Sequence, residues 1–188
     1  MHDNSATTPY QNKYRVESAR LHGWDYTSPG WYFVTICTRH HLCILGNVAR
    51  GQVQLSLSGE VAESELRNLP HHYVNISIDR FTVMPNHIHA IVVIDGQHRH
   101  SPNSETRTEP LSTSGLALIP PKAGSLSAII RSYKAGVTRR CHGMGLRTFA
   151  WQPGFYDHIV RANTSLQAIR DYIEKNPANW PQDPENQP

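Results

Sequence analysis

The chain has 188 residues, of which 38% are hydrophobic and 18% are charged, and its formal net charge is +3 at pH 7. This length suits one compact domain, and the hydrophobic fraction is sufficient for a buried core. No apolar run approaches the roughly 20 residues that cross a bilayer, and the polar N-terminus lacks a signal segment, so we expect a cytoplasmic protein without a membrane partner. The small basic excess permits a polyanionic partner but does not require one.

The cysteines argue against two common roles. Cys37, Cys43 and Cys141 are odd in number and form no CxxC pair. They therefore predict neither a disulfide framework nor a zinc knuckle. We interpret them as small, partly buried thiols.

The first half of the chain alternates between polar and patterned segments. Residues 1–20 are polar and are interpreted as an N-terminal arm. Residues 30–38, aromatic and β-branched after a turn signal, predict a strand. Residues 42–57 favour a small hairpin, and residues 59–69 form an amphipathic helical pattern that Pro70 is expected to end.

The middle of the chain contains two further strands and a helix. Residues 76–84 and 87–94 are β-rich runs separated by a Pro-Asn dipeptide. Residues 96–122 lack periodicity and are rich in Ser, Thr and Pro, which indicates a mobile insertion. Residues 125–141 have apolar side chains at helical spacing and a basic remaining surface.

The C-terminal part predicts one more strand and one more helix. Residues 155–161 have a strand pattern, and a capping box at residues 164–167 starts a helix near Ser165. That helix runs to about Asn176, because Pro177 disfavours helical geometry in the residue before it.

The order of strand, helix, two strands, helix, strand and helix predicts an α+β fold. The simplest arrangement is a ferredoxin-like antiparallel sheet with helices on one face and an additional C-terminal helix that carries Tyr172. We expect a single domain over residues 21–180 and a tail over residues 181–188.

Two histidines in the strand at residues 87–94 are candidates for chemistry. Strand alternation places His87 and His89 on one face and Ile88 on the other. Both faces stay apolar further along the strand, which predicts a central strand covered on both sides. Adjacent imidazoles suit a divalent cation, although a His-x-His pair in a strand more often only forms hydrogen bonds with a loop.

The last predicted helix supplies two partners for these histidines. Tyr172 and Asn176 are four residues apart and lie one above the other, beside an apolar stripe of Leu166, Ile169 and Ile173. Packing the stripe on the sheet brings the phenol and the amide to the margin of the buried face. Taken singly, Tyr172 is more simply an amphipathic core-edge residue, and Asn176 a helix C-cap.

Several motifs in the same order together resemble a known family. The heptad at residues 83–89, VMPNHIH, resembles the His-hydrophobic-His signature of single-tyrosine transposases, and specifically of the REP-associated tyrosine transposases. The likeness covers roughly residues 20–180. It includes the sequences around Asp25-Tyr26, GWYFVT at residues 30–35, WQP at residues 151–153, FYDHIVR at residues 155–161, and YI with NP at residues 172–173 and 176–177.

The resemblance implies a role for each candidate residue. His87, His89 and Asn176 are implied as ligands of Mg²⁺ or Mn²⁺, and Tyr172 as the nucleophile that forms a 5′-phosphotyrosine intermediate. Tyr156 also lies in a family motif, but Tyr172 is preferred because it alone has an amide partner at i+4. The implied substrate is single-stranded, hairpin-containing DNA. The sequence itself is compatible with a monomer or a homodimer. Plasmid relaxases and replication initiators share this chemistry but resemble the C-terminal motifs less well.

Phosphate contacts and base stacking are expected from the basic helix and its neighbours. The candidate nucleic-acid-binding residues are Arg131, Lys134, Arg139, Arg140, Trp151 and Arg161. A solvated helix face would explain the basic residues about equally well, and a place in the core would explain the aromatic one.

Two other functions fit parts of the pattern. The chain could be a non-catalytic nucleic-acid-binding regulator derived from such a transposase. It could also be a zinc protein in which Cys141 or His158 joins His87 and His89.

Overall fold

The computed structural model describes residues 23–96, 121–161 and 163–186. The expected N-terminal arm at residues 1–20 and residues 97–120 of the expected insertion lie outside the described residues. The strands of the main sheet are β1 (Gly30–Cys37), β4 (Ile76–Val83), β5 (His87–Ile94) and β6 (Tyr156–Val160). The helices are α1 (Leu57–His72), α2 (Leu126–Gly143) and α3 (Asn163–Lys175), with short 3₁₀ turns η1 (Arg39–His41) and η2 (Trp180–Gln182).

The main sheet confirms the predicted fold class. Its strand order is β4-β5-β1-β6, and each neighbouring pair is antiparallel. In chain order this is the second, third, first and fourth strand, the arrangement of a ferredoxin-like sheet. The predicted central position of the histidine strand is confirmed, because β5 lies between β4 and β1 and all eight of its residues are buried.

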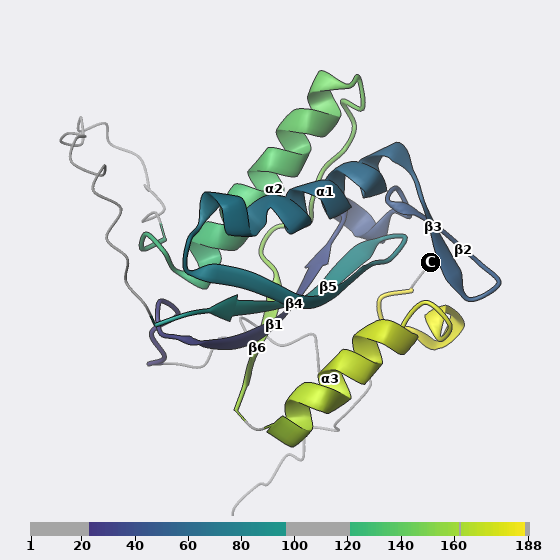
Figure 1. The fold of residues 1–188 in the computed structure, drawn as a ribbon. Coiled ribbons are helices and arrows are strands. Elements are labelled where there is room, and N and C mark those ends of the chain that lie inside the picture. Colours follow the sequence, from purple (N-terminus) through teal and green to yellow (C-terminus); the bar gives the residue numbers. More distant parts are fainter. Residues whose placement is uncertain (1–22, 97–120, 162, 187–188) are drawn as a thin grey trace, which may run out of the picture.

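Two helices cover one face of the sheet (Figure 1). Helix α1 begins after Ser56, whose side chain accepts a hydrogen bond from the Gly59 amide, and α2 begins in the same way after Ser125. Their apolar sides pack on alternate residues of β1 and β5 to form the main core. The expectation that Pro70 ends the first helix is wrong, because α1 continues to His72. Pro70 lies in the last turn, where only one helical hydrogen bond is lost.

Helix α3 covers the opposite face (Figure 1). Its buried Ile173 packs with Phe33 of β1 and with Ile91 and Val93 of β5. The residues on either side of these three in the sequence point to the other face of the sheet and belong to the main core. The additional helix expected from the sequence therefore lies across the sheet from the other two.

A β-bulge helps to fix α3 in place. The register between β4 and β5 shifts by one residue between Ile78 and Phe81. In the bulge, Asp79 accepts two hydrogen bonds from Arg170, at 2.7 and 2.8 Å, and the side chain of Arg80 pairs with Glu174 at 3.0 Å. The bulge therefore turns two charged side chains toward the helix that carries Tyr172.

The expected hairpin is present as a separate two-stranded sheet, β2 (Gly46–Ala49) and β3 (Gln52–Leu55). Its turn residues Arg50 and Gly51 have φ angles of 52° and 73°. Two consecutive positive φ values are typical of the turn that suits the twist of a two-residue hairpin. Within the described residues, no helix combines the length and apolar character that a membrane span requires.

Candidate active site

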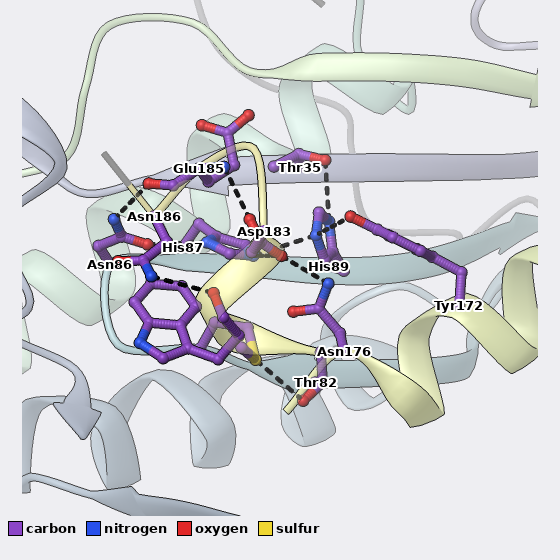
Figure 2. Close-up of polar contacts among 12 residues, drawn as sticks. Thr35, Thr82, Asn86, His87, His89, Tyr172, Asn176, Asp183, Glu185 and Asn186 are labelled. Atoms are coloured by element: carbon purple, nitrogen blue, oxygen red, sulfur yellow. Dashed lines mark hydrogen bonds and ion pairs between the residues drawn. The ribbon is translucent and has the colours of Figure 1, made fainter. Parts of the chain in front are cut away.

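The site forms where β5 begins, on the face of the sheet that α3 covers. His87 and His89 point to this face, as predicted, and their Nε2 atoms lie 3.0 Å apart (Figure 2). Across the neighbouring strand β1, Cys37 pairs with His87, and Thr35 pairs with His89. The two imidazoles therefore converge on each other, instead of each bonding only to a loop.

The hydrogen bonds of Asn86 define which nitrogen of His87 carries the proton. Asn86 Nδ2 donates to the main-chain carbonyl of Glu185 at 2.7 Å, so its Oδ1 faces His87 Nδ1, 2.8 Å away, and can only accept. Neutral His87 thus carries its proton on Nδ1 and keeps a lone pair on Nε2. The Thr35 hydroxyl lies 3.0 Å from His89 Nδ1 and orients the second ring in a similar way. The space between the two Nε2 atoms suits a shared proton or a cation.

Burial keeps both imidazoles neutral. It lowers the pKa of His87 to about 3, and the nearby His41 adds to this shift. Burial, reinforced by His87, also lowers the pKa of His89 well below its ordinary value, although the carboxylate of Asp183 acts in the opposite direction. Neutral imidazole is the form that binds a metal ion.

Tyr172 reaches the site from α3. Its hydroxyl lies 3.2 Å from His89 Nε2, and the centroids of the two rings are 5.1 Å apart (Figure 2). The ring also meets the edge of Phe33 in a T-shaped contact. The side chain is 41% exposed, so a macromolecular substrate can approach the phenol from solvent.

Asn176, one helical turn beyond Tyr172, is buried beside a carboxylate that the sequence analysis did not single out. Its Nδ2 donates to Asp183 Oδ2 at 2.6 Å, and this carboxylate oxygen lies 3.9 Å from His87 Nε2. The amide Oδ1 of Asn176 is buried and has no hydrogen-bond partner. A buried acceptor without a donor is costly, and a cation would satisfy it.

The donor atoms together fit a divalent cation. His87, His89 and Asp183 each offer one atom, and these atoms all lie within 4.8 Å of one another. These atoms are two imidazole nitrogens and one carboxylate oxygen. Mn²⁺ accepts such a mixed set more readily than Mg²⁺, which prefers oxygen ligands.

Asp183 belongs to a segment that the sequence analysis assigned to a tail. After Pro177 the chain turns through η2, and residues 183–186 return over the start of β5. The Trp180 ring lies 6.1 Å from that of His87, and Asp183 is buried. The available signal was a Pro-rich turn, WPQDP, with a carboxylate soon after the Tyr/Asn helix.

The candidate nucleic-acid-binding residues lie in different environments. Arg131 and Arg139 are exposed on α2, whereas Lys134 donates to the carbonyls of Gln152 and Gly154, and Arg140 pairs with Glu65. Helix α2 lies across the sheet from Tyr172.

The two predicted nucleic-acid contacts outside α2 also differ. Trp151 is 9% exposed and belongs to the main core, so its ring is not available to stack on a base. Arg161 is exposed after β6, with its guanidinium 5.9 Å from the centroid of the Trp24 ring.

The zinc alternative finds no support in the described part of the chain. Cys141 lies on α2 and is buried in the main core, and His158 is exposed on β6. Neither belongs to a group of side chains that could share an ion with His87 and His89 among the described residues. Tyr156, the competing tyrosine, is the first residue of β6 and pairs with Thr35 of β1. Its side chain packs on the sheet face that α3 covers.

Comparison with known proteins gives one relative in sequence and a related fold. No family model matches the chain. An uncharacterized protein of Haemophilus influenzae is 35% identical over 168 residues, which cover 88% of this chain and 90% of that protein.

Two solved structures are similar in fold. The REP-associated tyrosine transposase bound to a REP hairpin has a TM-score of 0.53 and 19% identity, covering 90% of this chain and 80% of that one. A candidate transposase from Deinococcus radiodurans has a TM-score of 0.46 and 14% identity, covering 82% and 95%, a similarity too low to establish a shared fold. The chain therefore belongs to one family with the Haemophilus influenzae protein and has the fold of the REP-associated tyrosine transposase.

Proposed function

We propose that this protein is a metal-dependent single-tyrosine transposase that cleaves and rejoins single-stranded, hairpin-containing DNA. The observation that carries this proposal is the contact between the exposed Tyr172 phenol and the buried His87-His89 pair, at 3.2 Å from His89 Nε2. A nucleophile that substrate can reach, placed against a set of cation ligands, is the arrangement that phosphoryl transfer to a side chain needs.

The reaction is a transesterification. The Tyr172 oxygen forms a bond to the phosphorus of a phosphodiester, and the bond from phosphorus to the 3′ oxygen of the preceding nucleotide breaks. That oxygen takes up a proton and leaves as a 3′ hydroxyl, while the DNA 5′ end stays attached to Tyr172. Because one phosphodiester replaces another, a later attack by a 3′ hydroxyl rejoins the strand without ATP.

Tyr172 must lose its proton during attack. The ordinary pKa of a tyrosine is near 10, so little phenolate is present at neutral pH. Without a bound cation, His89 Nε2, 3.2 Å from the Tyr172 hydroxyl, can accept this proton, and the Thr35 hydroxyl at Nδ1 holds the ring in position. The Asp183 carboxylate would stabilise the positive charge that His89 gains if it takes up this proton. A cation held by His89 would occupy the same lone pair, and the Tyr172 proton would then leave to solvent.

His87, His89, Asn176 and Asp183 would hold the cation, which we propose to be Mg²⁺ or Mn²⁺. A cation held there would supply positive charge that stabilises the scissile phosphate and the phenolate of Tyr172. Asn176 directly follows the last residue of α3, four residues after Tyr172, so the helix that positions the nucleophile also positions a proposed ligand.

The proposed substrate follows from the fold relationship, since the neighbouring transposase was solved with a REP hairpin. Arg131, Arg139 and Arg161 are exposed and remain proposed phosphate contacts. Lys134 and Arg140 can contribute to the electrostatic field of this surface while they keep their intramolecular partners.

The test is covalent capture of DNA. Purified protein is mixed with labelled single-stranded hairpins from the flanks of its own gene and Mn²⁺, and adducts are separated on denaturing gels. We expect an adduct with wild-type protein that disappears with EDTA and with Tyr172→Phe. The matched control is Tyr156→Phe, which removes the other candidate phenol and should keep the adduct.

Two outcomes would contradict the proposal. An adduct that survives in Tyr172→Phe but not in Tyr156→Phe would move the nucleophile to β6. DNA binding without an adduct on any hairpin would instead support the non-catalytic regulator.

A further inference from the structure

A second cluster of metal-ligand side chains lies beside the candidate active site, on groups that the proposed reaction does not use. Cys37 is the last residue of β1, His41 ends the η1 turn, and Glu185 comes from the segment after η2. One atom from each lies within 4.8 Å of the others. The cluster is partly buried, and Cys37 pairs across the strands with His87.

The contacts within this cluster centre on one carboxylate oxygen. Glu185 Oε2 lies 3.5 Å from Cys37 Sγ and 3.3 Å from His41 Nδ1. The His41 Nδ1 atom is inaccessible to solvent, and its alignment with the carboxylate makes no hydrogen bond. The Cys37 thiol therefore donates a hydrogen bond to Glu185, whereas the buried Nδ1 of His41 faces the same carboxylate without a hydrogen-bond partner.

The backbone beneath the cluster is unusual. His40 and His41 have φ angles of 56° and 52°, in the left-handed region that non-glycine residues seldom occupy. The Thr38 hydroxyl lies 2.8 Å from the Leu42 carbonyl and 2.9 Å from the Asn86 carbonyl, and its single proton, donated to either, holds this turn against the start of β5. Sparsely populated backbone conformations are concentrated at sites of binding or catalysis.

We propose that Cys37, His41 and Glu185 form a second cation site, selective for a zinc-type ion. A thiolate, a neutral imidazole and a carboxylate are the ligands that Zn²⁺ and Co²⁺ prefer, whereas Mg²⁺ and Mn²⁺ prefer oxygen. On binding, the Cys37 thiol releases its proton to solvent, and the thiolate and carboxylate together neutralise the dication.

The second site would tie the C-terminal segment to the end of β1. Glu185 lies two residues beyond Asp183, and its carbonyl already accepts a hydrogen bond from Asn86 (Figure 2). An ion held by Glu185 therefore restrains the same segment that presents Asp183 to His87. This inference does not depend on the proposed function, since it concerns binding of a metal alone.

The experiment is a titration of the reduced, metal-free protein with Co²⁺, followed by absorbance. A thiolate ligand gives a sulfur-to-cobalt charge-transfer band, which the nitrogen and oxygen ligands around His87 cannot produce. We expect the band in wild-type protein, and we expect it to saturate at one equivalent in the His87→Ala/His89→Ala variant, which lacks the other proposed cation site. The band should be lost in Cys37→Ser and Glu185→Gln, and kept in Cys43→Ser, whose exposed cysteine lies outside the cluster.

Two further measurements separate the sites. The His87→Ala/His89→Ala double variant should keep the band, because its substitutions leave the sulfur site intact. Chelator competition should show that Cys37→Ser lowers the Zn²⁺ affinity by at least about 100-fold. Loss of a residue that only supports a metal ligand costs up to about 100-fold, and loss of a ligand itself should cost at least as much. Circular dichroism establishes whether each variant is folded. If Cys37→Ser does not fold, Glu185→Gln provides the test of the site. Absence of the band in wild-type protein, or its survival in Glu185→Gln, would overturn the proposal.

Discussion

The two faces of the main sheet use the same strands for different purposes. On the face under α1 and α2, the inward residues of β5 are Ile88, Ala90, Val92 and Ile94, all of which belong to the main apolar core. On the face under α3, Ile91 and Val93 continue that pattern, but the two positions before them are histidines. One face of β5 therefore contributes mainly to the stability of the fold, whereas the other face also carries the candidate catalytic residues.

The buried polar side chains on the α3 face of the sheet are tolerated because most of them form hydrogen bonds with one another. Asn86 and Thr35 bond to the outer nitrogens of the imidazoles, and Asn176 bonds to Asp183. Buried polar groups cost stability only where they lack partners, so a closed network of this kind can replace part of an apolar core. The unsatisfied Oδ1 of Asn176 marks the point where the network is open to a ligand.

The sharpest test of this division compares a core residue on each face. Leu66→Ala, in α1, and Ile173→Ala, in α3, each remove a fully packed side chain, and each should lower the free energy of unfolding by about 2–5 kcal/mol. Only Ile173→Ala should also weaken Mn²⁺ binding, because Asn176 directly follows α3 and is positioned by it. Urea denaturation and calorimetric titration at a temperature where both variants are folded give the two quantities. Equal losses of metal affinity would contradict the division.

The second prediction concerns pH. In the unfolded chain both histidines bind protons below about pH 6.5, whereas in the metal-free folded protein they resist protonation until far lower pH. Their contribution to the free energy of unfolding is therefore constant above pH 6.5 or so. It falls on acidification, by up to about 1.4 kcal/mol per pH unit for each histidine.

Denaturation of the metal-free protein between about pH 7 and about pH 5 measures this slope. His89→Gln should flatten it, and His158→Gln, which alters an exposed histidine on β6, should not. An unchanged slope in His89→Gln would show that these histidines do not set the acid sensitivity.

A smaller effect is expected from the residues that orient the imidazoles. Thr35→Val removes the hydroxyl beside His89 Nδ1 while it keeps the shape of the side chain, and should weaken Mn²⁺ binding by roughly 10-fold or more. Thr138→Val removes a hydroxyl that donates to the Lys134 carbonyl on the other face, and is the matched control. Equal affinities in the two variants would argue against an orienting role for Thr35.

The smallest predicted difference lies in the ion pairs that hold α3 to the β4 bulge. The side chains of Arg170 and Asp79 are 28% and 15% exposed, against 52% and 60% for Arg80 and Glu174. Since solvent screens exposed pairs, a double-mutant cycle should give a larger coupling for the first pair. Coupling that is equal in both, or absent from the first, would mean that apolar packing alone positions the helix.

Most of the fold and part of the site could be predicted from local patterns. The strands follow from β-branched runs, and the placement of His87 and His89 follows from strand alternation. Tyr172 and Asn176 follow from their spacing beside the apolar stripe of α3. In each case the relevant neighbours lie within a few residues, where periodicity reports geometry directly.

The rest depends on how distant segments meet. Asp183 could not be predicted, because its position depends on an irregular turn that closes against β5 only in the folded chain. Trp151 was expected to contact DNA, but sequence alone does not distinguish an exposed indole from one packed against Tyr133 and Phe149. Lys134 and Arg140 likewise fit the pattern of a basic surface, yet their intramolecular partners come from other parts of the chain.

The short segment after η2 has a consequence for how the site is maintained over time. Its described contacts are largely polar and involve Asn86, Asn176, Cys37 and His41, whereas α1 and α2 are held by an extensive apolar core. Segments with few apolar contacts open locally at a fraction of the free energy of global unfolding. The ligand set around His87 can therefore come apart and reform many times during the life of a molecule that never unfolds.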